Sequence, residues 1–135
     1  MKNRKNKATK IAFVLYLLFL VWLVIFKFNF SLNDIHKVRE VNLIPFYYDN
    51  VMEGDIPLFE ALFNLLVFIP FGFLLHKIWN GKIYWKVSII LGLSLLFEIT
   101  QYVLSVGASD ITDLITNTLG GIIGIGCAAI LSKKK

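Results

Sequence analysis

Two carboxylates and an amide stand together in the stretch VGASDITDLITNTLGG, residues 106–121, where an otherwise apolar run begins. Asp110, Asp113 and Asn117 are three and four residues apart, a spacing that aligns them on one face of an α-helix. Ionised carboxylates accept hydrogen bonds and attract cations, and two carboxylates with separated pKa values can act as an acid and a base. The pattern therefore predicts a site for binding or for proton transfer.

Two further apolar runs carry polar stripes with helical spacing. Glu98 and Gln101 are three residues apart in the third run, and Glu60 and Asn64 are four apart in the second. Glu98 stands in mid-helix, where a carboxylate has no capping role, so a functional interpretation is favoured for this residue. Taken singly, the other polar residues also fit structural roles, namely an N-cap, a first-turn acid and hydrogen bonds between helices.

The elements that must position these residues are four apolar runs. The chain of 135 residues is 57% hydrophobic and only 17% charged. So many apolar side chains present more apolar surface than a soluble domain of this length could bury. Each run is close to the roughly 20 residues that cross a bilayer as a helix. We therefore predict an all-α membrane protein, a four-transmembrane-helix bundle in one domain over residues 1–135, with helices at about 11–28, 57–79, 83–106 and 111–131.

The distribution of basic residues predicts the orientation of the bundle. The net charge is +5, and eleven of the fourteen Lys and Arg residues flank the runs on the side that holds both termini. The positive-inside rule then predicts a multi-pass protein of the cell membrane with both termini in the cytoplasm. The segment between the first two helices becomes an outer loop with an interfacial or re-entrant piece. No basic stripe with interleaved aromatics is present, so we expect the lipid bilayer, and no nucleic acid, as partner.

This topology brings all three polar stripes to the outer half of the membrane. One Asp at mid-membrane costs roughly 3 kcal/mol, against roughly 3–5 kcal/mol gained from the nine Leu and Ile residues of the fourth helix. Gly120 and Gly124 form a G-x-x-x-G pattern, which is typical of close helix packing. No nucleophile motif, phosphate loop or metal-ligand spacing is present, so we expect no cofactor and no metal site.

Four blocks of this sequence resemble the VanZ-like family of small bacterial membrane proteins, which is associated with resistance to teicoplanin. The blocks are REVNLIPF with Arg39 and Asn42, NLLVFIPFGF with Asn64, FEITQ with Glu98 and Gln101, and DITDLITNTLGGIIG. The resemblance covers the chain from about Arg39 to the last helix. Many similar proteins carry an arginine after the glycine that precedes the first aspartate, whereas this chain has Ala108 and Ser109, so any role for that cation is lost or passes to Arg39.

Three hypotheses follow. The first is a non-enzymatic envelope protein whose outward acidic and amide pocket binds a polar or cationic envelope ligand or a lipid head group, with amines or a divalent cation favoured over phosphate. The second is an enzyme acting on a lipid-linked cell-wall precursor, with Glu98 and Asp113 as acid and base. The third is a scaffold that contacts another membrane complex through its glycine face. The predicted binding residues are Arg39, Asn42, Glu60, Asn64, Glu98, Gln101, Asp110, Asp113 and Asn117.

Overall fold

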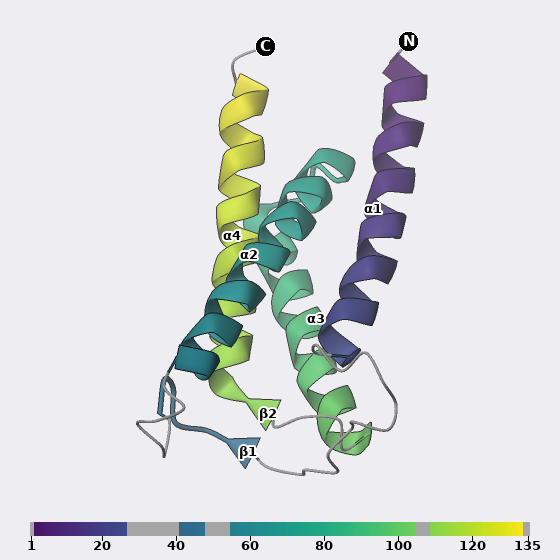
Figure 1. Ribbon diagram of the computed structural model, residues 1–135. Helices are drawn as coiled ribbons and strands as arrows, with labels where there is room; N and C mark the ends of the chain where they lie inside the picture. Colours follow the sequence, from purple (N-terminus) through teal and green to yellow (C-terminus); the bar gives the residue numbers. More distant parts are fainter. Residues whose placement is uncertain (1, 27–40, 48–54, 105–108, 134–135) are drawn as a thin grey trace.

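The chain folds as a bundle of four α-helices joined at one end by a pair of very short strands (Figure 1). A computed structural model describes residues 2–26, 41–47, 55–104 and 109–133. The elements are α1 (Lys2–Phe26), β1 (Val41–Asn42), α2 (Asp55–Ile78), α3 (Ile83–Leu104), β2 (Ser109–Asp110) and α4 (Ile111–Lys133).

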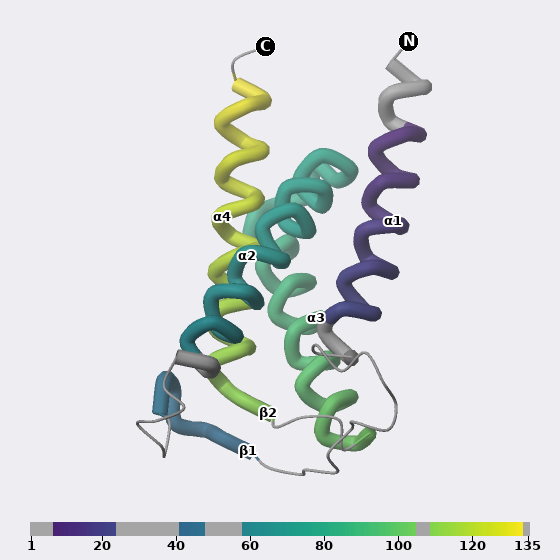
Figure 2. The backbone as a smooth tube through the Cα atoms, in the orientation of Figure 1, coloured from purple at the N-terminus to yellow at the C-terminus, as the bar shows by residue number. Residues whose placement is uncertain are grey.

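Successive helices run in alternating directions, so the bundle has two distinct ends (Figure 2). We call the end with β1, β2 and the first turns of α2 and α4 the loop end. The other, which we call the terminal end, holds the start of α1, the end of α2, the start of α3 and the end of α4 (Figure 1). Both described extremities of the chain therefore lie at the terminal end.

The predicted helices are confirmed, with one correction at the first. The bounds of α2 and α4 lie within two residues of the prediction, and α3 begins at the predicted residue. The first helix was expected to begin near Ile11, whereas α1 begins at Lys2. The prediction followed the apolar run alone, but residues 2–10 contain no Pro or Gly, and their Lys, Arg and Ala residues favour a helix.

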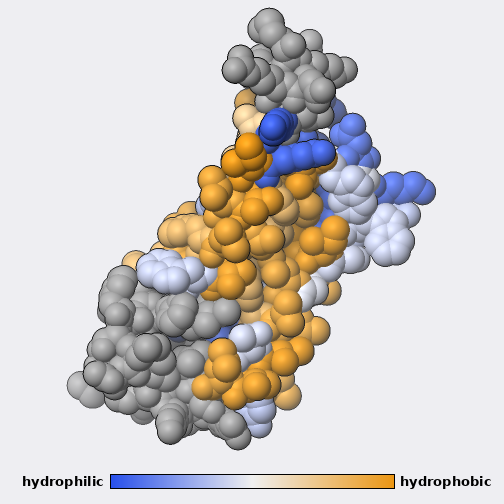
Figure 3. All heavy atoms as spheres, turned by 90° about the vertical axis from the view of Figure 1, so that its right-hand side faces the viewer, coloured by the Kyte–Doolittle hydropathy of each residue, from blue (hydrophilic) through white to orange (hydrophobic). Residues whose placement is uncertain are grey.

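Within the described ranges, three helices are long and apolar enough to cross a membrane, at residues 58–78, 83–104 and 111–133, and α1 adds a shorter apolar stretch. Only 28–39% of the most apolar window of each of these three spans is buried inside the protein. The rest of that surface needs a cover other than water. Figure 3 shows this surface as an apolar belt across the middle of one face, with polar residues above it. The fold is that of an all-α membrane protein.

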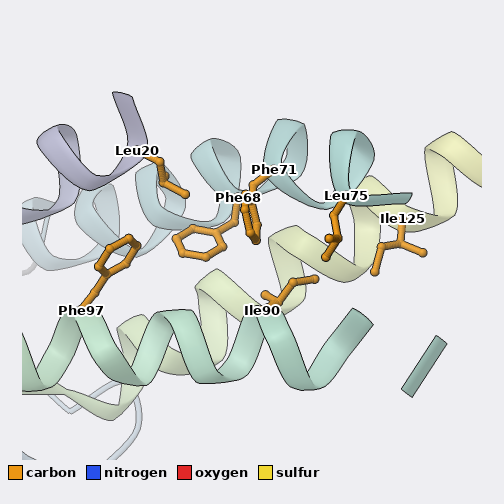
Figure 4. Close-up of a cluster of buried hydrophobic side chains, with 7 residues drawn as sticks. All are labelled: Leu20, Phe68, Phe71, Leu75, Ile90, Phe97 and Ile125. Carbon is orange, nitrogen blue, oxygen red and sulfur yellow. The ribbon is translucent and has the colours of Figure 1, made fainter. Parts of the chain in front are cut away.

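The apolar core lies where all four helices meet (Figure 4). The rings of Phe68 on α2 and Phe97 on α3 meet edge to face, with centroids 6.3 Å apart, and Phe68 also contacts Phe71. Such edge-to-face pairs add to the stabilisation that burial provides. The cluster consists of Leu20, Phe68, Phe71, Leu75, Ile90, Phe97 and Ile125.

The closest helix contact joins α2 and α4 through their backbones. A Cβ atom at Gly120 would collide with the carbonyl oxygen of Leu65, and one at Gly124 with that of Ile69. The packing role predicted for the G-x-x-x-G pattern is therefore confirmed. Because α2 of the same chain occupies this glycine face, the face is not available to a partner, which removes the basis of the scaffold hypothesis.

The described part of the loop, residues 41–47, packs against the start of α4. β1 pairs with β2 in parallel, with Val41 beside Ser109 and Asn42 beside Asp110. Phe46 has a positive φ of 57°, uncommon for a residue with a Cβ, and its N–H donates to Thr112 Oγ1 at 3.0 Å. This hydrogen bond helps to hold the strained turn, so the loop is fixed to the helix that carries the predicted acids.

Candidate functional site

The polar stripes of α3 and α4 face each other inside the bundle. Ile90 lies against Gly121, where a Cβ would come within 2.6 Å of Ile90 Cδ1, and Asn117 Nδ2 donates to Ser94 Oγ at 2.9 Å. The two helices are antiparallel, so each step of four residues forward along α3 corresponds to four residues back along α4. One further step from the pair of Ser94 and Asn117 therefore places Glu98 at the level of Asp113. The register therefore brings the two predicted acids to one depth.

These side chains are almost completely buried. Glu98 is 5% exposed and Asp113 is 4% exposed, and both lie on the inner faces of helices whose outer faces are apolar. Buried polar groups are retained at such depth only where hydrogen bonds or a bound group compensate the lost hydration. We call the buried set the polar cluster: Asn64, Ser94, Glu98, Gln101, Asp113 and Asn117.

Asn117 supplies an acceptor whose hydrogen-bonding capacity is unmet. Its side chain is 1% exposed, and its Oδ1 accepts no hydrogen bond from the described residues, although its Nδ2 is bonded to Ser94. An unsatisfied buried acceptor costs about 1–3 kcal/mol. A donor supplied by water or by a ligand would remove this penalty.

Helix α2 also contributes to the cluster, through Asn64, which is 3% exposed. Asn64 precedes Leu65, whose carbonyl contacts Gly120 of α4, so its backbone lies within about one helical turn of the level of Asn117. Glu60 lies one turn closer to the loop end and is partly buried. The structure thus places Asn64 near the level of Asn117, and the partly buried Glu60 nearer the level of Asp113.

Asp110 has a structural role at the mouth of the cluster. Its Oδ1 accepts the N–H of Thr112 at 2.7 Å, which is an N-cap of α4, and its Oδ2 accepts from Asn42 Nδ2 at 3.2 Å. Its own N–H donates to Glu98 Oε2 at 2.9 Å. Asp110 therefore links the loop, α3 and α4, and Glu98 is oriented by a backbone donor.

Comparison with known proteins identifies the family of the chain. The family model described as VanZ/LLP1 matches residues 13–132, a range that contains every predicted site residue. The chain belongs to the VanZ/LLP1 family. It is also 38% identical over 114 residues to the protein VanZ of Enterococcus faecium, covering 82% of this chain and 67% of that protein. No solved structure matches the chain at a significant level.

Two residues of this VanZ/LLP1 chain were missed by the sequence analysis. Thr112 is 1% exposed and binds the loop, and Thr116 is 5% exposed and donates to the carbonyl of Thr112 at 3.0 Å. Threonine in a membrane helix commonly bonds its own backbone, so neither residue stands out by type. Their four-residue spacing, in step with Asp113 and Asn117, is the signal that could have found them.

Two positions considered in the sequence analysis, Arg39 and Ala108, lie outside the described residues. Within the described ranges, no three His, Cys, Asp or Glu side chains gather in a way that could hold a metal ion. The described site thus combines two carboxylates at one depth with three buried amides, and a capped helix lies at its mouth.

Proposed function

We propose that this VanZ/LLP1 protein crosses the cell membrane several times, with both termini in the cytoplasm and the loop end outside. The distribution of charge supports this orientation, because eleven of the fourteen Lys and Arg residues flank the terminal end. All nine Asp and Glu residues fall between Asp34 and Asp113. The common position of the start of α1 and the end of α4 fits two cytoplasmic termini.

In this orientation the polar cluster binds an amine or another polar, donor-rich group at the outer leaflet, and this binding lowers susceptibility to teicoplanin-type glycopeptides. The observation that carries the proposal is the burial of Glu98 and Asp113 at one depth, beside the unmet acceptor of Asn117. Ionised carboxylates and an amide oxygen act as acceptors, so an ammonium group fits them and a phosphate does not. The similarity to VanZ supports the antibiotic phenotype.

The test compares single substitutions in a susceptible bacterium that expresses the chain. Glu98→Gln and Asp113→Asn keep the size of the side chains and remove the charge. Both should return the teicoplanin susceptibility to that of cells without the protein, at unchanged membrane level by immunoblot. Thr100→Val is the matched control, because Thr100 is partly exposed on α3 and, among the described residues, its hydroxyl bonds only the carbonyl of Leu96 in its own helix. Full protection by both charge variants would reject the polar cluster as the site.

The facing register of Glu98 and Asp113 also favours a second function, that of an enzyme acting on a lipid-linked cell-wall precursor. Two carboxylates in environments of different polarity can serve as acid and base. Purified protein would be incubated with lipid-linked precursors, and products would be sought by mass spectrometry. Product that depends on both carboxylates would establish an enzyme, and no turnover across the panel would favour binding alone.

A further inference from the structure

A buried lysine and a histidine meet at the terminal end, far from the polar cluster. Lys86 lies in the first turn of α3 and is only 4% exposed. Its Nζ is 3.3 Å from Nδ1 of His76, near the end of α2. The sequence analysis only counts Lys86 among the basic residues that flank the apolar runs, so its burial against a histidine is a property that the fold alone shows.

Among the described residues, no Asp or Glu side chain pairs with this lysine. The sequence contains no Asp or Glu in residues 1–33, 61–97 or 114–135, the stretches that form the four helix ends here. The two neighbouring lysines have separate contacts: Lys77 Nζ donates to Ser132 Oγ at 2.8 Å, and Lys82 Nζ lies 5.7 Å from the ring centroid of Tyr84. Figure 3 shows polar residues gathered at this end, above the apolar belt.

A buried ammonium without a counter-charge is unfavourable, and two features add to the positive potential around Lys86. Its position in the first turn of α3 is next to the positive end of the helix dipole. Its contact, His76, carries no negative charge in either of its ordinary states. When Lys86 donates as an ammonium, Nδ1 of His76 accepts, and the ring N–H lies on Nε2. The site then presents donors and positive charge, and it lacks an anion.

We propose that the terminal end binds the phosphate of an anionic phospholipid between α2 and α3, at Lys86 and His76. A lipid fits better than a free anion because the site lies at the edge of the apolar belt. The aromatic side chains of Trp79, Tyr84 and Trp85 are 38–56% exposed here, and Trp and Tyr are enriched at the level of lipid head groups. Acyl chains would extend from the phosphate along the exposed apolar side chains of α2 and α3.

The experiment measures lipid retention by native mass spectrometry on protein purified in neutral detergent. The protein would be titrated with phosphatidylglycerol, and with phosphatidylcholine as the neutral comparison. The wild-type chain should retain phosphatidylglycerol selectively, and Lys86→Met and His76→Leu should each weaken this retention about fivefold or more. Lys10→Gln is the matched control, because it removes an exposed charge from the same end on α1 and should change retention less than about twofold.

The outcomes of the lipid-retention experiment either support or overturn a phospholipid site at Lys86 and His76. Selective retention that is lost in the Lys86 and His76 variants and kept in the Lys10 variant supports the proposal. Unchanged retention in both variants overturns it, as does an equal loss with Lys10→Gln, which would show attraction by net charge alone. Displacement of phosphatidylglycerol by millimolar inorganic phosphate would identify a free anion as the ligand and overturn the lipid assignment.

A stability measurement covers the case of a variant that fails to fold. Methionine has nearly the length of lysine and carries no charge, so Lys86→Met should fold in neutral detergent with an unchanged or higher melting temperature. Phosphatidylglycerol should then raise the melting temperature of the wild-type chain and leave that of Lys86→Met unchanged. An equal rise in both proteins would contradict the site.

Discussion

The two ends of this bundle treat charge in opposite ways. At the loop end, Asp110 is satisfied by three hydrogen bonds within the chain, to Thr112, Asn42 and Glu98. At the terminal end, Lys86 is more deeply buried than the partly exposed Asp110, and among the described side chains its ammonium group meets only His76. The contrast shows that burial alone does not identify a charge with a structural role. The number of hydrogen-bond partners within the chain distinguishes a charged side chain that stabilises the fold from one that is a candidate for ligand binding.

The largest loss of stability is expected at the contact of α2 with α4, the two helices that connect the loop end with the terminal end. Gly124→Ala puts a Cβ onto the carbonyl of Ile69, which cannot move without displacing α2, so we expect a loss of about 1–3 kcal/mol. Gly126→Ala is the matched control, because a Cβ at Gly126 meets nothing within 4 Å and gains up to about 1 kcal/mol of helix propensity. Melting temperatures of the two proteins in detergent should move in opposite directions.

A smaller loss is expected at the loop end. Asp110→Ala removes the N-cap of α4 and the hydrogen bond from Asn42, which should lower the free energy of unfolding by about 0.5–2 kcal/mol. Thermal unfolding monitored by the intrinsic fluorescence would measure this change, with Ser88→Ala, an exposed hydroxyl on α3, as the comparison. An unchanged melting temperature would mean that these bonds do not fix the mouth of the polar cluster.

The smallest effect is expected at the terminal end. Ser132→Ala removes the exposed side-chain partner of Lys77 and should change the free energy of unfolding by less than about 0.5 kcal/mol. The same unfolding measurement would test it. A loss above about 1 kcal/mol would show that internal hydrogen bonds hold the basic residues at this end, and the contrast between the ends would disappear.

The helices and the polar stripes could be predicted because both depend on residue patterns within short stretches of the sequence. Apolar runs gave the helices, and the three- and four-residue spacings put Glu98, Gln101, Asp113 and Asn117 on the inner faces where the structure has them. The helical start of α1 at Lys2 was missed because hydropathy records the membrane segment and not the helix.

Contacts between distant residues could not be predicted. The bond from Asn42 to Asp110 joins positions 68 apart, and no spacing rule relates them. The burial of Lys86 was missed for a different reason, because a lysine near the end of an apolar run usually reaches water, and only the packing of α3 on α2 turns it inward. Both features depend on which side chains come into contact, and these contacts are set by the tertiary arrangement.

The contact between α2 and α4 also has a consequence for how this protein tolerates sequence change. On α4 the contact depends on residue identity, since only glycine leaves room at positions 120 and 124. On α2 residue identity matters at Gly72, where a Cβ would collide with the carbonyl oxygen of Gly121, whereas at Leu65 and Ile69 the contact is made by carbonyl groups, which every amino acid possesses. Random mutagenesis should therefore leave positions 72, 120 and 124 nearly invariant and let positions 65 and 69 vary more freely.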